Sequence, residues 1–236
     1  MNESEIIENF YKVRQQIKNA ELKSGRKEGS VKLCAVSKFH PVEDVKAAIK
    51  AGQFLFGENR VQEAHAKFTE LNNKDAELHI IGQLQSNKVK KALEVASCIQ
   101  SVDREPLLQE IEKQAAKLEK NIRVFFELHT AEDSKSGYAD EDTLLVSCEN
   151  FAKGLYPHIT PAGLMTMAPF SKDEKLIRQS FQKLRNLKEL LNSKFPELPV
   201  AELSMGMSGD YIIAIEEGST MVRVGTALFG ERNYNI

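Results

Sequence analysis

Short apolar runs alternate with longer amphipathic stretches along the chain. The apolar runs are rich in β-branched and aromatic residues, which is typical of strands in a buried parallel sheet. Eight such runs occur, at residues 31–37, 53–57, 78–82, 97–102, 122–129, 159–166, 200–206 and 220–225. Between most of them apolar residues recur at helical spacing, most clearly over 41–52, which ends in Gly52, and over 173–195. The pattern therefore predicts eight strands joined by helical crossovers.

Eight strands with helical crossovers predict an α/β protein built as a single (β/α)8 barrel, or TIM barrel. An open doubly wound sheet also alternates strands and helices, but the sequence lacks the G-x-G-x-x-G that often follows the first strand of such a sheet. A helical pattern over residues 3–24 precedes the first strand. Because no Pro/Ser-rich linker interrupts the chain, we predict one domain, 1–236, with an N-terminal helical segment (1–28) and a barrel (29–236).

The composition is that of an ordinary globular protein, with 42% hydrophobic and 28% charged residues among 236. A formal net charge of -2 argues against broad electrostatic attraction to nucleic acid. No apolar run approaches the ~20 residues that span a bilayer, and the acidic start lacks the order of a secretory signal. We therefore expect a cytoplasmic protein with neither nucleic acid nor membrane as a partner.

The chain has three cysteines, Cys34, Cys98 and Cys148, and they are widely spaced. This spacing suggests neither a disulfide framework nor a metal site. We interpret the three as buried, unreactive thiols.

The first apolar run ends in a lysine, Lys38. In a barrel the carboxyl ends of the strands form the active face, so Lys38 is predicted to stand at its mouth. Apolar surroundings disfavour the charged form of a lysine amine, and the neutral amine attacks carbonyl carbons to form Schiff bases. The alternative is a lysine that reaches solvent or pairs with a carboxylate such as that of Glu58.

Small and hydroxyl residues follow the last two predicted strands. They are Ser204, Gly206, Ser208, Gly209, Gly225 and Thr226. Barrels often bind phosphate with the loops after these two strands, through backbone N–H groups and hydroxyls. The alternative is that the glycines serve only as turns. An amine after the first strand and a phosphate site after the last two match the aldehyde and phosphate ends of pyridoxal 5'-phosphate (PLP). Strands 8 and 1 are neighbours in a closed barrel, so the two groups can lie within one small molecule of each other. Arg223 then lies between them.

Seven motifs identify a family. In chain order they are AVSKFHP, FGENRVQE, HIIGQLQSNK, SKSGY, GLMTM, LSMGMSGD and GSTMVRVGTALFGER. From about Val31 to Arg232 the chain closely resembles the pyridoxal phosphate homeostasis protein family, also called the YggS-like family. The resemblance implies a barrel similar to the N-terminal domain of alanine racemase, with PLP held as an internal aldimine.

The resemblance also assigns residues. It implies Lys38 as the Schiff-base lysine, Asn59 as the residue beside the ring and Arg223 as the residue that faces the pyridine nitrogen. The phosphate-binding positions that it implies are Ser204, Ser208, Gly225 and Thr226.

Two functions agree with this site. The one we favour is a protein without catalytic residues that holds PLP and passes it to apo-PLP enzymes, acting as a monomer. The alternative is a small PLP-dependent amino-acid racemase or lyase. Racemisation needs a second base, which the resemblance implies is a tyrosine from a further domain of alanine racemase, and we expect neither Tyr138 nor Tyr211 to replace it. We further hypothesise that Lys135 takes the aldehyde from Lys38 during release.

Overall fold

The computed structural model describes residues 1–130 and 137–231. Its strands form a closed parallel barrel in which each strand pairs with the next and the eighth pairs with the first. The strands are β1 (Lys32–Val36), β2 (Leu55–Glu58), β3 (Glu77–Ile80), β4 (Cys98–Val102), β5 (Ile122–Glu127), β6 (Ile159–Met165), β7 (Glu202–Ser204) and β8 (Met221–Val224). Six lie within predicted runs, and β2 and β3 each extend one residue beyond theirs, at Glu58 and Glu77, so the predicted barrel is confirmed.

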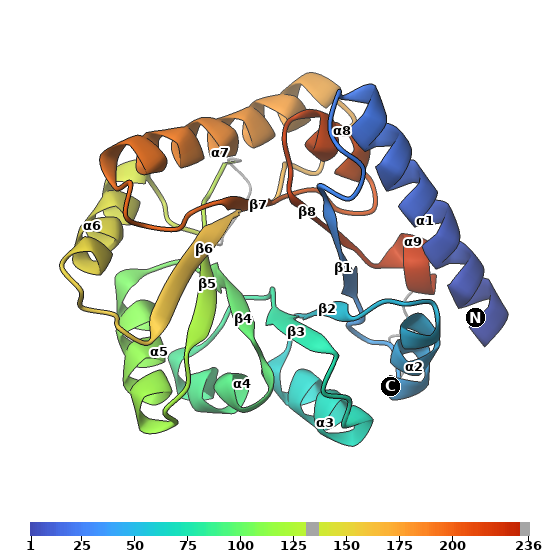
Figure 1. Cartoon of the computed structure of the whole chain (residues 1–236), viewed down its shortest axis with the longest axis horizontal. Coiled ribbons are helices and arrows are strands. Elements are labelled where there is room, and N and C mark those ends of the chain that lie inside the picture. The colour runs from blue at the N-terminus through green and yellow to red at the C-terminus, as the bar shows by residue number, and fades with distance from the viewer. Residues whose placement is uncertain (131–136, 232–236) are drawn as a thin grey trace.

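Helices surround the barrel, as Figure 1 shows. They are α1 (Glu3–Lys23), α2 (Val42–Lys50), α3 (Val61–Leu71), α4 (Val89–Val95), α5 (Glu105–Lys117), α6 (Glu141–Ala152), α7 (Glu174–Lys194), α8 (Tyr211–Glu216) and α9 (Thr226–Phe229), with a 3-10 turn at Ser86–Lys88 before α4. Helices α1 and α7 are the two long helices that the periodicity predicted over 3–24 and 173–195.

Helix α1 is the extra helix that precedes the barrel. It begins with a capping box, in which Asn2 accepts from the backbone of Glu5 and the Glu5 side chain accepts from the backbone of Asn2. Its apolar face packs against α2, α8 and α9, and the ring of Phe10 meets that of Phe229 edge-on at 5.6 Å. The helix therefore covers the outer side of the barrel where β8 meets β1, the strands predicted to carry the site (Figure 1).

The barrel interior is filled rather than open. Its apolar cluster includes Cys34, Cys98, Phe125, Met165 and Met221. Burial raises the pKa of the Cys34 thiol to about 12, so this thiol stays protonated at neutral pH. All three cysteines are buried and free, as predicted. Because the interior is packed, space for a ligand is left only at an end of the barrel.

Among residues 1–130 and 137–231, no helix is long and apolar enough to cross a membrane. The same residues hold no cluster of three or more His, Cys, Asp or Glu side chains arranged to bind a metal ion.

Candidate functional site

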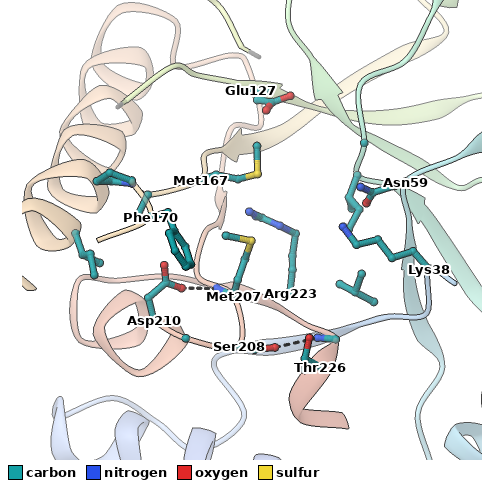
Figure 2. A pocket seen from close by; sticks show the side chains of 18 of the residues that line it. Lys38, Asn59, Glu127, Met167, Phe170, Met207, Ser208, Asp210, Arg223 and Thr226 are labelled. Atoms are coloured by element: carbon teal, nitrogen blue, oxygen red, sulfur yellow. Dashed lines mark hydrogen bonds between the residues drawn. The ribbon is translucent and has the colours of Figure 1, made fainter. Parts of the chain in front are cut away.

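A cavity of about 440 Å³ opens at the carboxyl ends of the strands, and Figure 2 shows its wall. Its volume lies within the range of small-molecule sites. Of the predicted site residues, those that line it are Lys38, Asn59, Ser208, Arg223, Gly225 and Thr226. They come from the ends of β1, β2 and β8 and from the loop after β7. The barrel thus brings together six residues that are spread along the chain from Lys38 to Thr226.

Lys38 is half-buried, and its side chain runs into the cavity beside Asn59 (Figure 2). Both of its neighbours in the chain are held by side chains of α3. Lys67 Nζ donates to the carbonyl oxygen of Ser37 at 2.7 Å, and the amide of Phe39 donates to Glu63 Oε1 at 2.6 Å. Lys38 is therefore fixed on both sides by backbone hydrogen bonds.

The turn at Phe39 has a left-handed backbone, with φ of 64°. Such a conformation is costly for a bulky residue and persists only where its surroundings impose it. Here Glu63 holds the amide, and the guanidinium of Arg60 lies 5.0 Å from the centre of the Phe39 ring. The strained turn redirects the chain after β1 and leaves Lys38 at the cavity.

Lys67 is itself held by two carboxylates. Its Nζ lies 2.6 Å from Glu58 Oε1 and 3.0 Å from Glu63 Oε1, and Ser37 Oγ donates to Glu58 Oε1 at 2.8 Å. Glu58 and Lys67 are both buried, and desolvation raises the pKa of Glu58. The motif FGENRVQE therefore supplies both carboxylates, and α3 supplies the lysine, of an ion-pair cluster that supports the Lys38 turn.

Asn59 is positioned by close backbone packing. A Cβ atom on Gly82 would lie 2.6 Å from the carbonyl oxygen of Asn59 and 2.8 Å from its Cα. Only glycine fits at position 82 without displacing Asn59. This explains the glycine that ends the third predicted strand.

Hydroxyl and backbone donors form the wall opposite Asn59. The amide of Gly225 donates to Ser208 Oγ at 3.3 Å, and Thr226 follows at the start of α9 (Figure 2). The carboxylate of Asp210 accepts from the Met207 amide at 2.5 Å and so fixes the loop that carries Ser208. Burial raises the pKa of Asp210. The two predicted phosphate loops therefore meet at one side of the cavity.

Arg223 points into the cavity from β8 and is 4% exposed. Its Nη1 donates to the carbonyl oxygen and to Oγ of Ser204, at 2.7 and 2.8 Å, and its Nη2 donates to the carbonyl oxygen of Thr166 at 2.8 Å. Ser204 is fully buried and is not among the residues that line the cavity. In this geometry Ser204 holds Arg223, whereas the sequence analysis expected it at the phosphate.

Of the tyrosines and histidines that the structure describes, none lines the cavity. Tyr138 is buried and its hydroxyl lies 2.9 Å from Ser147 Oγ, while the Tyr211 hydroxyl bonds to Gln16. His79 is fully buried and hydrogen-bonded, as expected for a structural histidine. His129 is not among the lining residues. Lys135 lies outside the described residues.

Two carboxylates in the wall, those of Glu127 and Asp210, were not singled out from the sequence. Glu127 ends β5 and is 2% exposed. Because Glu127 lies inside an apolar predicted strand, the sequence gives no sign that its side chain lines the cavity. Gln100 of β4 was also missed, although it bonds to Ser204 at 2.6 Å.

The donor set suits a small molecule with an aldehyde and a phosphate. Lys38 supplies an amine, Ser208 and Thr226 supply hydroxyls beside the amides of a glycine-containing loop, and Arg223 supplies a buried cation. Amines attack aldehydes, and hydroxyls with backbone amides bind phosphate oxygens. Pyridoxal 5'-phosphate carries both groups on one ring, and the residues present fit it.

Comparisons with known proteins agree with the barrel fold. The family model described as "Alanine racemase, N-terminal domain" matches residues 9–233. The "Pyridoxal phosphate homeostasis protein" of Vibrio alginolyticus is 40% identical over 237 aligned positions, which cover 98% of this chain and 100% of that protein.

Solved structures are similar over the same span. PipY of Synechococcus elongatus, solved with PLP bound, superposes with a TM-score of 0.84 at 36% identity and covers 95% of this chain and 100% of its own. Alanine racemase from Corynebacterium glutamicum, at 17% identity and a TM-score of 0.73, shares the fold, with 98% of this chain matched to 61% of that one. On a relationship that spans nearly its whole length, the chain belongs to the pyridoxal phosphate homeostasis protein family, whose barrel is that of the alanine racemase N-terminal domain.

Proposed function

We propose that this chain binds PLP in the cavity, with Lys38 as the Schiff-base lysine and Asn59 beside the ring. Ser208, Gly225 and Thr226 bind the phosphate, and Arg223 faces the ring nitrogen. The observation that carries the proposal is that an amine, a phosphate-type loop pair and a buried arginine line one cavity of about 440 Å³. PipY, a similar structure with PLP bound, supports it.

The chemistry that PLP supplies when bound is an electrophilic aldehyde carbon. Lys38 Nζ, in its neutral form, adds to that carbon, a carbon–nitrogen double bond forms, and the aldehyde oxygen leaves as water. The buried network behind Ser37 and Phe39 keeps the amine directed into the cavity.

We infer that the role of this binding is PLP homeostasis inside the cell: the chain holds the reactive aldehyde and delivers it to apo-PLP enzymes without turnover. Arg223 supports this role, because an arginine at the ring nitrogen favours the unprotonated ring and so weakens the electron sink that most PLP catalysis needs. The buried, hydrogen-bonded hydroxyls of Tyr138 and Tyr211 also support it, since neither tyrosine lines the cavity.

The test is to load the purified protein with PLP, record its absorbance, reduce it with borohydride and map the modified peptide. We expect a visible Schiff-base band and a reduced label on Lys38. Lys38→Ala is expected to lose both. Lys32→Ala is the matched control, because Lys32 lies at the start of the same strand, where its amine pairs with Glu202 at 2.9 Å. A label on any lysine other than Lys38 would overturn the assignment.

A further inference from the structure

A continuous chain of hydrogen bonds crosses the barrel interior and ends on Arg223. Arg223 Nη1 lies 2.8 Å from Ser204 Oγ, which lies 2.6 Å from Gln100 Oε1. Gln100 Nε2 lies 2.6 Å from His79 Nδ1, and His79 Nε2 lies 3.0 Å from Glu77 Oε1. The chain of contacts runs from β8 through β7 and β4 to the start of β3, at the opposite end of the barrel from the cavity.

The direction of every bond is fixed by its neighbours. A guanidinium only donates, so Ser204 Oγ accepts from Arg223 and its own hydrogen goes to Gln100 Oε1. That orients the amide of Gln100, whose nitrogen then donates to His79 Nδ1. His79 therefore carries its proton on Nε2, from which it donates to Glu77. The guanidinium of Arg123, whose Nη2 lies 3.2 Å from the same nitrogen, donates to Glu77 instead.

Each inner member of this chain is shielded from water. His79, Gln100 and Ser204 are fully buried. Desolvation, assisted by Arg123, lowers the pKa of His79 against the opposing effect of the Glu77 and Glu202 carboxylates, so the ring is neutral. At the outer end of this chain of hydrogen bonds, Arg123 forms an ion pair with Glu77. A buried polar group that loses its partner is costly, so the groups hold one another in a single arrangement.

We infer that Gln100 and His79 are positioning residues for Arg223. They fix the side of the guanidinium that faces Ser204 and so direct its remaining donors into the cavity. The inference rests on the proposed function, in which Arg223 faces the ring nitrogen of PLP. It assigns to Gln100 a role in cofactor binding although Gln100 does not line the cavity.

The experiment compares PLP with an analogue that has a C–H group in place of the ring nitrogen. Dissociation constants are measured for wild type, Gln100→Met, Ser204→Ala and the control Ser219→Ala. Ser219 is also fully buried, and its hydroxyl donates to the backbone carbonyls of Met205, just after β7, and Met221, the first residue of β8. We expect Gln100→Met and Ser204→Ala to weaken PLP about tenfold, and the analogue clearly less, because the loss acts through the ring nitrogen. We expect the control Ser219→Ala to change the dissociation constants of PLP and of the analogue by the same factor.

Equal weakening of both ligands by Gln100→Met would overturn the inference, since it would show only a general structural effect. Failure of wild type to bind PLP would instead contradict the proposed function. A second measurement needs no variant: the ¹⁵N spectrum of His79 in the wild-type protein is expected to show the neutral Nε2–H tautomer. An Nδ1–H tautomer or a charged ring would overturn the hydrogen-bond chain itself.

Discussion

Lys67 Nζ lies 2.7 Å from the carbonyl oxygen of Ser37, the residue that precedes Lys38. The same amine lies 3.0 Å from Glu63 Oε1, which also accepts the amide of Phe39, the residue that follows. Two side chains of α3, those of Lys67 and Glu63, thus hold the backbone on both sides of the Schiff-base candidate.

Substitution of Lys67 by methionine is expected to lower the free energy of unfolding by about 3 kcal/mol or more, because Glu58 is left buried without its cation. We also expect borohydride trapping of PLP on Lys38 to slow. Chemical denaturation and mass spectrometry measure the two effects. Lys46→Met is the control, since Lys46 is largely exposed on α2. Unchanged stability and trapping in Lys67→Met would show that the cluster does not support the site.

Removal of a hydroxyl at the phosphate side is expected to weaken PLP retention. Thr226→Ala or Ser208→Ala should cost about 1.5–3 kcal/mol for each lost charge-assisted hydrogen bond, measured as the dissociation constant by equilibrium dialysis. Pyridoxal, which lacks the phosphate, should bind the wild type far less tightly and should be insensitive to both substitutions. If wild type held the two vitamers equally well, these loops would serve only as turns.

A methyl group at Gly82 is expected to disturb Asn59. The added Cβ would lie 2.6 Å from the Asn59 carbonyl oxygen, so the backbone must shift, at about 1–3 kcal/mol of unfolding free energy and with weaker PLP binding. Gly209→Ala is the stability control, because a Cβ at Gly209 meets nothing within 4 Å, and its change should stay within about 0.5 kcal/mol. Equal melting behaviour of the two variants would contradict the close packing.

Local patterns in the sequence predict most of this fold. Runs such as 31–37 and 122–129 alternate with helical periodicity, and every run overlaps a strand. Lys38 and Thr226 are found because polar residues directly after predicted strands must gather at one end of a closed barrel. These two residues can therefore be predicted without knowledge of any side-chain contact.

Other parts of the site depend on contacts that a single sequence does not reveal. Gln100 stands inside an apolar run, and nothing in its neighbours indicates that it meets Ser204, which is 104 positions away. Ser204 resembles a phosphate ligand because it begins a loop of small residues, yet its hydroxyl is taken by Arg223 and Gln100. Lys67 lies on a helix where a solvated lysine is the ordinary expectation.

The stability of the protein in acid is expected to depend on Glu77. The hydrogen bond from His79 is the main cause that holds the pKa of this carboxyl at about 2, against an ordinary value of 4.5. Between these values the unfolded chain binds more protons than the native one, so the stabilisation is complete above about pH 4.5 and is lost as the pH falls towards 2. Since 40% of the side chain is exposed, water screens the effect and we expect a loss of about 1 kcal/mol.

Glu77→Gln is expected to flatten that part of the stability curve, while its side-chain oxygen still accepts from His79. Urea denaturation at several pH values measures the slope. The control is Glu8→Gln on α1, where 63% of the glutamate side chain is exposed. If the glutamine at position 77 left the acid slope unchanged, the Glu77 carboxylate would not be the group that titrates.

The PLP-loaded protein is expected not to interconvert L- and D-alanine faster than free PLP. Racemisation needs one proton-transfer group on each face of the substrate carbanion, and Lys38 supplies at most one. Tyr138 is buried with its hydroxyl 2.9 Å from Ser147 Oγ, so it is not placed to supply the other. Chiral chromatography after long incubation measures the turnover, with Lys38→Ala as the control protein.

Turnover above that of free PLP, abolished by Lys38→Ala, would make the protein an enzyme. The second base would then be sought among the titratable groups of the cavity wall, where Glu127 and Asp210 supply carboxylates. Asp210→Asn and Glu127→Gln each remove a carboxylate and keep a side-chain oxygen, which at position 210 can still accept from the Met207 amide. Loss of racemisation with PLP binding retained in one of these variants would identify that carboxylate as the base.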